Sequence, residues 1–260
     1  MSTLLKAIRI VGPAVLVALL VASIWQGIIY WFDYPSFLLP GPCRVAKAIF
    51  AASELLSKAF LTTLATSIVS LLVALFVGVL LAILFSQSTI LRVACYPYVI
   101  FLQTVPIVAI APLLIIWSGS GPRTVVLIAL IISVFPIISN TTAGLLAIDR
   151  NHRDLFRLYG AGRWATLWRL QIPTAVAYLA LGMKISCGLA VIGTIVGEYF
   201  VSTGQAGYVG LGSLMSSWQT QGKTDGLFAI VFASTLLGLI IFGSVNLLTR
   251  TVLKRWVNLA

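Results

Sequence analysis

Charged residues are scarce in this sequence. Only 9% of its 260 residues are Asp, Glu, Lys or Arg, and 60% are hydrophobic. Ordinary soluble domains are about 25% charged and roughly 45–50% apolar, so the composition argues against a soluble globular protein or a disordered chain. The 17 Lys and Arg outnumber the 6 Asp and Glu, but they are too sparse for a nucleic-acid-binding groove. We interpret the excess as an orientation signal, because Lys and Arg gather on the cytoplasmic side of a membrane.

Residue types that carry catalysis and metal binding are equally rare. His152 is the single histidine, which leaves little for His-based metal clusters or Ser-His triads. Cys43, Cys95 and Cys187 lie far apart without CxxC spacing, so we interpret them as small packing residues. We therefore expect no catalytic residues, no metal site and no cofactor bound by this chain.

A phosphate-binding loop is also lacking. Gly222-Lys223-Thr224 resembles the end of one, but the full pattern needs a glycine five positions before Gly222, where Ser217 stands. No strand is expected before this segment. The sequence thus predicts that this chain does not bind ATP itself.

What is present is a series of long runs without charge. Arg9 and Asp33 enclose 23 uncharged residues, and Lys58 and Arg92 enclose 33. A helix that crosses a bilayer needs about 20 apolar residues, and helices satisfy their own backbone groups in lipid. The sequence predicts one all-α integral membrane domain, 1–260, with six transmembrane helices at about 10–32, 60–86, 93–117, 123–147, 173–200 and 226–250.

The basic residues predict the orientation of these spans. With both termini in the cytoplasm, 11 Lys and Arg lie on that side and 5 on the other, with Lys184 set aside inside the membrane. The positive-inside rule therefore favours cytoplasmic termini. The first span could instead be a signal peptide, but its apolar run is too long and lacks a clean small-x-small cleavage site.

Residues 149–173 carry more charge than any other part of the chain. We expect a short helix over Asp154–Tyr159, capped by Asp149 or Asn151 and stopped by Gly160 and Gly162. A second helix from Arg163 would stop before Pro173. Composition leaves two interpretations open: an amphipathic segment at lipid headgroups, or a plug for a groove on a partner protein.

The spacing in this segment resembles a motif of bacterial ABC importer permeases: Glu-Ala-Ala, three residues, Gly, nine residues, then Ile-x-Leu-Pro. Here Asp154-Leu155-Phe156 stands at the first triplet, Gly160 follows at the family's spacing, and Leu170-Gln171-Ile172-Pro173 ends the pattern. The triplet departs from the motif because Leu and Phe replace two small residues.

Further pieces resemble the branch of this family that imports nitrate, sulfonates, taurine and pyrimidine precursors, and they occur in the family's order. They are Leu39-Pro40-Gly41-Pro42, Thr104-Val105-Pro106, Ala111-Pro112-Leu113, Trp117-Ser118-Gly119, Phe135-Pro136 with Gly144-Leu145, and Gly197-Glu198-Tyr199 with Gly210-Leu211-Gly212. The resemblance covers nearly the whole chain.

The resemblance implies a membrane subunit of a binding-protein-dependent importer in the bacterial inner membrane. Its expected partners are two cytoplasmic ATPase subunits that use ATP, a second permease subunit as a homodimer or heterodimer, a periplasmic solute-binding protein and the lipid bilayer, with no nucleic acid. It also implies a cytoplasmic coupling helix between spans four and five. The residues that would couple to the ATPase are Asp154, Leu155, Phe156, Arg157, Tyr159, Gly160 and Pro173.

Candidates for the translocation path are weaker, and each has a structural alternative. Pro106 and Pro112 interrupt a span, either at the path or as packing kinks. Asn140 either contacts solute or bonds between helices. Lys184 either attracts an anionic solute or snorkels to the interface. Glu198 either meets the binding protein, gates the path or serves as a structural acid at a helix end.

Two questions stay open in the sequence. The alternative function is a secondary transporter or channel without an ATPase, but no inverted repeat is visible. Ala109-Ile110-Ala111-Pro112 and Asn140-Thr141-Thr142 favour thiamine-precursor pyrimidines or similar heterocycles as solute, with nitrate, sulfonate and taurine as alternatives.

Overall fold

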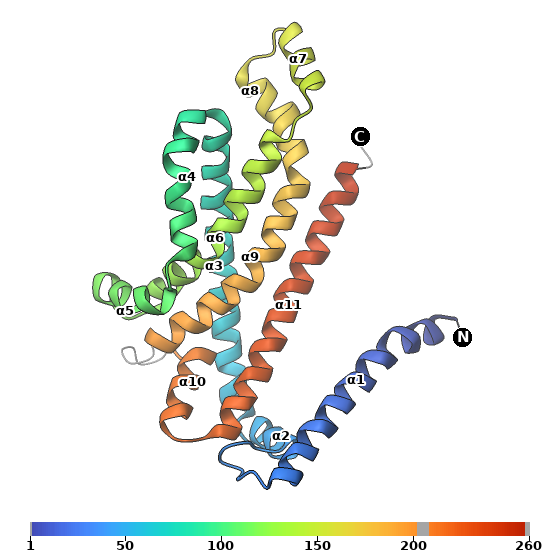
Figure 1. Ribbon diagram of the computed structural model, residues 1–260, viewed down its shortest axis with the longest axis vertical. Helices are drawn as coiled ribbons and strands as arrows, with labels where there is room; N and C mark the ends of the chain where they lie inside the picture. Colours follow the sequence, from blue (N-terminus) through green and yellow to red (C-terminus); the bar gives the residue numbers. More distant parts are fainter. Residues whose placement is uncertain (1, 202–207, 258–260) are drawn as a thin grey trace.

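The computed structural model describes residues 2–201 and 208–257, and this part of the chain contains helices and no strands (Figure 1). Its elements are α1 Ser2–Phe32, α2 Pro42–Ala51, α3 Ser53–Gln87, α4 Thr89–Thr104, α5 Ile107–Ser118, α6 Pro122–Leu146, α7 Arg150–Leu158, α8 Arg163–Thr166, the π-helical η1 Leu167–Gln171, α9 Ile172–Val201, α10 Leu211–Thr220 and α11 Thr224–Val257.

Five helical segments are long and apolar enough to cross a membrane: α1, α3, α6, the continuous helix Arg163–Val201, and α11. They match five of the six expected spans, with shifted ends. The helices α4 and α5 pass the same test only together, and they meet at a 102° bend. The expected span over 93–117 is therefore divided between two helices, and it counts as a sixth span only if the bent pair is taken as one.

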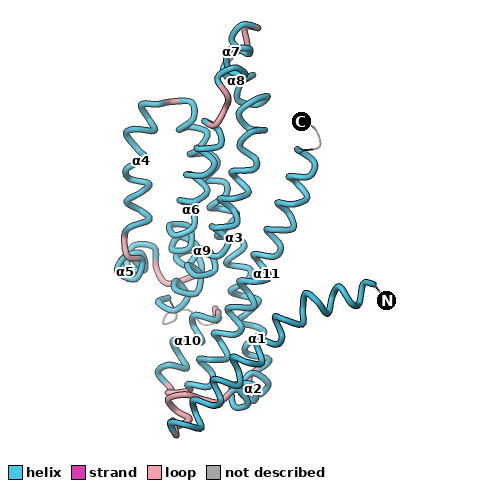
Figure 2. The backbone as a smooth tube through the Cα atoms, turned by 45° about the vertical axis from the view of Figure 1, so that its right-hand side comes forward, coloured by secondary structure: helices cyan, strands magenta, loops and turns pink. Residues whose placement is uncertain are grey.

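The bend lies at Val105 and Pro106, and proline chemistry explains it. Pro106 has no N–H to donate to the preceding turn, and its ring disfavours a helical conformation at residue 105. Val105 is accordingly extended, with φ −70° and ψ 127°, and Pro106 becomes the N-cap of α5. Figure 2 shows this α4–α5 elbow, where α5 turns sharply away from α4. Pro112 and Pro136 lie inside continuous helices.

The centre of the bundle is α6, which packs along α9 and α3. Small residues on α9 allow this close approach, as is common between helices in membranes. A Cβ atom at Gly182 would lie 2.8 Å from the carbonyl oxygen of Pro136, and one at Gly193 would lie 2.7 Å from Cα of Ala129. Larger residues at these two positions would push α9 away from α6.

The helix that starts at Arg163 continues through Pro173 to Val201. The expectation that it stops before Pro173 is wrong. Residues Leu167–Gln171 form a π-helical stretch, and the N–H of Ile172 bonds to the carbonyl of Leu167, five residues back. A π-helical turn changes the hydrogen-bond register within a helix, and here it places Pro173, which has no N–H to donate, just after the irregular turn.

The molecule has two ends, which we name by their elements. The α7 end carries α7 and α8 beyond the bundle, and the α10 end carries α2 and α10 (Figure 1). The helix α1 diverges from the other helices and touches α11 through Trp25, which stacks on Phe228 at 5.4 Å. Leu16 and Leu19 of α1 are each 64% exposed, so this apolar helix is not covered by the rest of the described chain.

Candidate functional site

The α7 end presents a short helix held by local interactions. The side chain of Asp149 accepts a hydrogen bond from the N–H of Asn151, as expected for a helix cap. The helix begins at Arg150, earlier than predicted. Gly160 has φ +67°, a left-handed conformation that glycine adopts without strain, and the chain reverses there into α8. This loop, between α6 and the long helix Arg163–Val201, is where the sequence predicts the coupling helix.

The outer face of α7 is apolar and uncovered. Leu158 is 85% exposed and Tyr159 83%, and Leu155 is also exposed. Phe156 is half-buried. Asp154 is exposed and pairs with Arg157 at 3.7 Å, an exposed ion pair that contributes little stability. A helix that ends in exposed Leu and Tyr side chains can fit an apolar groove on another protein.

The expected path residues do not form one cluster. Pro106 and Pro112 are exposed on the α4–α5 elbow. Asn140 in α6 donates a hydrogen bond to the Pro136 carbonyl at 2.8 Å, within its own helix. Lys184 is half-buried in α9, and no carboxylate of the described residues pairs with it.

Glu198, the fifth path candidate, is fully buried near the α10 end. Its Oε2 accepts hydrogen bonds from Thr63 Oγ1 at 2.8 Å and from the Gly212 N–H at 3.1 Å, while its Oε1 accepts one from the Tyr208 hydroxyl at 3.2 Å. We call these four residues the Glu198 cluster. A carboxylate with several donors is how a protein satisfies a buried charge. In this structure Glu198 therefore joins α3, α9 and the segment before α10.

The cluster also explains why glycine occupies positions 210 and 212. A side chain at Gly210 would overlap the Glu198 carboxylate, and one at Gly212 would overlap the carbonyl oxygen of Ile195. A tyrosine hydroxyl is protonated at neutral pH, and burial, together with the neighbouring Glu198 carboxylate, raises the pKa of Tyr208 further. Sequence reasoning singled out Glu198 and the glycines but missed Thr63 and Tyr208, because a Thr or Tyr in an apolar region carries no distinctive signal.

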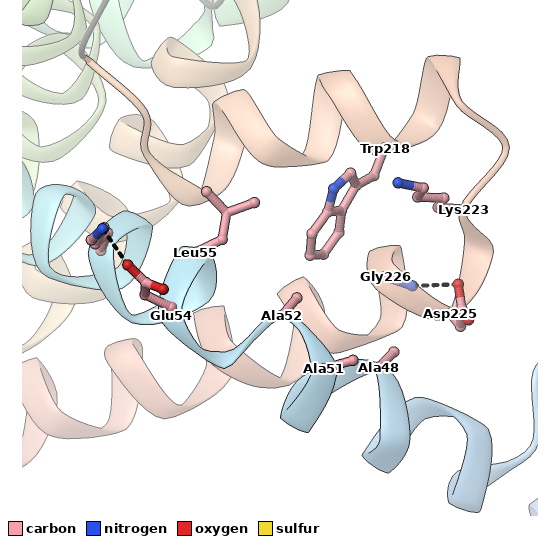
Figure 3. Close-up of a pocket in the computed structure, with 10 residues that line it drawn as sticks. Ala48, Ala51, Ala52, Glu54, Leu55, Trp218, Lys223, Asp225 and Gly226 are labelled. Carbon is pink, nitrogen blue, oxygen red and sulfur yellow. Dashed lines mark hydrogen bonds and ion pairs between the residues drawn. The ribbon is translucent and has the colours of Figure 1, made fainter.

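A groove of about 650 Å³ opens at the α10 end between α2, the start of α3 and the α10–α11 turn. Trp218 forms one wall, and its ring packs against the backbone of Gly226 (Figure 3). The opposite wall carries Glu54, which pairs with Lys58 at 2.6 Å. The groove therefore combines an aromatic wall with exposed charges of both signs.

The described residues offer no metal centre. Among them no group of three or more His, Cys, Asp or Glu side chains lies close enough to hold an ion. Gly222-Lys223-Thr224 forms the turn into α11, where Gly222 has φ +67° and Thr224 donates to the carbonyl of Phe37 at 2.6 Å. No phosphate-binding loop is formed there.

The described chain is thus a bundle of apolar helices long enough to cross a membrane, with a short exposed helix at one end. Residues 74–254 match the family described as binding-protein-dependent transport system inner membrane component. The chain belongs to this family, so it is a permease component of an ABC importer for small solutes. The predicted family is thus confirmed, and nothing supports a transporter that acts without an ATPase.

Several relatives are similar to this chain over almost its full length. The chain is 33% identical to the riboflavin transport system permease protein RibX of Chloroflexus aurantiacus, covering 94% of this chain and 89% of that protein. It is 30% identical to the formylaminopyrimidine transport permease protein ThiX of Halalkalibacterium halodurans, covering 90% and 92%. The putative aliphatic sulfonates permease SsuC of Bacillus subtilis is 27% identical, covering 95% and 86%.

A solved structure shows the same fold. The chain resembles the inward-facing methionine ABC transporter MetNI with a TM-score of 0.64 over 78% of this chain and 98% of that chain. The sequence identity is 17%, so this likeness concerns the fold alone.

Proposed function

We propose that this chain forms half of the translocation path of an ATP-driven importer in the bacterial inner membrane. A second permease subunit completes the path, two cytoplasmic ATPase subunits hydrolyse ATP, and a periplasmic binding protein delivers the solute. Family membership supports this division of labour. So does the sequence, which contains no phosphate-binding loop.

The observation that carries the proposal is the exposed helix α7. Its outer face presents Leu155, Leu158 and Tyr159, and it connects α6 directly to the helix Arg163–Val201. Movement of an ATPase groove that holds α7 would pass to both helices as a rigid-body rotation. We infer that α7 is the coupling helix, with Asp154–Gly160 seated on the ATPase and Pro173 at the irregular turn that follows.

The charge distribution supports a cytoplasmic α7 end. Five arginines lie between residues 150 and 169, and positive residues favour the cytoplasm. The termini of the chain would then lie on the same side. The α10 end would face the periplasm, where the groove beside Trp218 is available to the binding protein.

The uncovered apolar helices support a second permease subunit. The exposed leucines of α1 and the exposed elbow at Pro106 are surfaces that either lipid or another subunit must cover. We propose that the elbow, with Pro112, Asn140 and Lys184, lies towards the path between the two subunits. Irregular backbone at membrane depth is tolerated where it is buried in protein or lines a cavity.

For the solute we propose a small heterocycle. Two relatives at 30% and 33% identity are named for formylaminopyrimidine and riboflavin transport, and the sequence favours a thiamine-precursor pyrimidine. Nitrate and sulfonates are the alternative solutes.

Coupling is tested with Asp154→Arg and Gly160→Pro. Proline cannot adopt the positive φ of Gly160, and arginine at 154 reverses the charge on the docking face. We expect both variants to insert normally but to lose ATP-driven uptake in proteoliposomes that contain the ATPase and the binding protein. Copurification of the ATPase should fall at least tenfold.

Thr251→Arg is the matched control, because it adds an arginine at an exposed position of α11 near the α7 end of the molecule. It should leave uptake and copurification unchanged. Normal uptake and normal ATPase copurification in both α7 variants would refute the coupling proposal.

A further inference from the structure

A second cavity lies behind α7, between this helix and the bundle. Its volume is about 350 Å³. Three arginines line it, Arg153 and Arg157 from α7 and Arg163 from α8, together with Gln87 at the end of α3, Thr166 and Gln171. We call it the arginine pocket. It differs from the exposed apolar face of Leu155, Leu158 and Tyr159, although Arg157 belongs both to the pocket and to the segment that the coupling proposal seats on the ATPase.

The two sides of α7 point in different directions. At 100° per residue, Arg153, Phe156 and Arg157 fall on one side of the helix, while Leu155 and Leu158 fall on roughly the opposite side. Exposure agrees for Arg153 and Phe156, which are half-buried, and for Leu158, which is 85% exposed, while Arg157 at the pocket mouth is exposed. A partner seated on the leucines would leave the arginine pocket free for a different ligand.

The pocket has an excess of positive charge. Arg157 pairs with Asp154 at 3.7 Å, but both side chains are exposed and the pair is weak. Within the described parts of the chain, no carboxylate lies within 4.0 Å of the guanidinium of Arg153 or Arg163. Arg163 also opens the continuous helix Arg163–Val201, where the positive end of the helix dipole opposes a cation and favours an anion.

A buried amide points to the same ligand chemistry. Gln171 is only 8% exposed and lines the pocket. Its Oε1 accepts a hydrogen bond from Gln87 Nε2 at 2.8 Å, so its orientation is fixed. Its Nε2 donates no hydrogen bond to the described residues and is open to the pocket's solvent, so it is free to donate to a ligand there. The pocket thus offers one amide donor and three guanidinium groups to an acceptor.

We propose that the arginine pocket binds a phosphate group, supplied either by an anionic phospholipid of the adjacent leaflet or by free phosphate. Guanidinium groups match phosphate oxygens in bidentate geometry. The level of the pocket relative to the membrane favours a lipid headgroup. Trp164 and Trp168 are exposed on the same helix segment, and exposed Trp residues mark a membrane interface. Basic pockets at the cytoplasmic ends of membrane helices suit these headgroups. A bound phosphate would neutralise the arginines and fix α7 to the bundle.

The test uses the purified full-length permease in a neutral detergent. Thermal unfolding is measured with added phosphatidylglycerol, with phosphatidylcholine, and with inorganic phosphate against chloride at equal ionic strength. Native mass spectrometry counts the bound lipid. The pocket variant is Arg153→Gln with Arg163→Gln. The control is Arg150→Gln with Arg169→Gln, which removes the same charge from exposed arginines that do not line the pocket.

We expect phosphatidylglycerol to stabilise the wild type and the control more than phosphatidylcholine does. The pocket variant should bind phosphatidylglycerol about tenfold more weakly and lose at least half of the stabilisation. Without lipid the pocket variant should be as stable as the wild type, because the substitutions remove two of the three positive charges that repel one another in the pocket. Stabilisation by phosphatidylglycerol alone assigns the site to a lipid, and stabilisation by inorganic phosphate assigns it to the free ion.

Two results would overturn the proposal. One is an equal loss in both double variants, which would show general attraction between arginines and anionic lipid. The other is the absence of any shift with either probe while the pocket variant releases the ATPase, which would assign the arginines to an acidic protein surface. The coupling proposal is decided by uptake in Asp154→Arg and Gly160→Pro, whereas the pocket proposal is decided by lipid and phosphate binding, so the two can fail separately.

Discussion

At the residue scale, the most informative side chain is Glu198. A carboxylate in the middle of apolar helices is costly unless donors surround it. Here the donors come from two directions along the chain: Thr63 lies 135 residues away, and the Gly212 N–H lies 14 residues further on. Thr63 also accepts from the N–H of Leu211 at 2.8 Å. Glu198 therefore holds the start of α10 against α3.

This arrangement predicts a large cost for truncation. In Glu198→Ala the Thr63 hydroxyl and the Gly212 N–H lose their acceptor, while the Tyr208 hydroxyl keeps Thr66 Oγ1 at 3.0 Å as a partner. Each unsatisfied donor costs about 1–3 kcal/mol. We expect the apparent unfolding temperature in detergent to fall by several degrees. Glu198→Gln keeps one acceptor oxygen but turns an amide NH₂ towards donors. Its fall in unfolding temperature should therefore be intermediate.

The control for this prediction is Glu54→Ala, which removes an exposed carboxylate that pairs only with the exposed Lys58. Exposed pairs contribute about 0–1 kcal/mol, so this variant should unfold close to the wild-type temperature. Equal unfolding temperatures for Glu198→Ala and Glu54→Ala would contradict the role of the Glu198 cluster.

The glycine within the Glu198 cluster, Gly212, gives a second prediction. In Gly212→Ala the new methyl group would overlap the Ile195 carbonyl oxygen and press on Cβ of Glu198. Overpacking of this kind costs about 1–3 kcal/mol. We expect lower thermal stability and faster proteolysis at the α10 end. Gly238→Ala is the matched control in α11, because nothing lies within 4 Å of its new methyl group, and it should be neutral or slightly stabilising.

At the element scale, the sequence predicts the helices well but not their interruptions. Charge-free runs locate five spans, because lipid demands long apolar helices. The same criterion cannot detect the α4–α5 elbow, since both halves are apolar and a proline alone does not say whether a helix kinks or breaks. Pro106 breaks its helix, whereas Pro112 and Pro136 do not. The π-helical turn before Pro173 is equally invisible in the sequence.

The candidate functional residues also differ in how well the sequence predicts them. The spacing around Gly160 locates α7, because a cap, a short helix and a stop signal are local features. The Glu198 cluster and the arginine pocket depend on contacts between residues distant in sequence, such as Gln87 with Gln171 across 84 positions. Only the folded bundle brings these residues together.

The elbow gives the third prediction. Spin labels at Tyr98 and Ile116, both exposed, report the distance across it in a chain whose native cysteines are replaced. Pro106→Ala restores an N–H and frees residue 105 for helix, so we expect a longer and broader distance distribution. Pro112→Ala changes a proline that lies within α5 and should leave the distribution unchanged. An unaltered distribution in Pro106→Ala would show that packing, rather than proline, sets the bend.

At the scale of the whole molecule, the two ends differ in chemistry. The α7 end is rich in arginine and presents exposed leucines, while the α10 end presents a groove walled by Trp218 and contains the buried Glu198 cluster. The helices α3, α6, Arg163–Val201 and α11 connect these ends. A signal at one end can therefore reach the other through helices that move as units, which is what an importer requires if ATP is used on one side and solute arrives on the other.

The fourth prediction tests this orientation directly. Cysteines placed at Tyr159 and at Thr220 lie at exposed positions of opposite ends. If the α7 end is cytoplasmic, a membrane-impermeant maleimide should label Thr220→Cys in spheroplasts and Tyr159→Cys only in inverted vesicles. The native Cys43 is exposed near the α10 end and is replaced beforehand. Labelling of Tyr159→Cys in intact spheroplasts would reverse the topology, and the arginines would then lie on the side that the positive-inside rule disfavours. Such a reversal would also remove α7 from any cytoplasmic ATPase, so this measurement decides the orientation on which the coupling proposal depends.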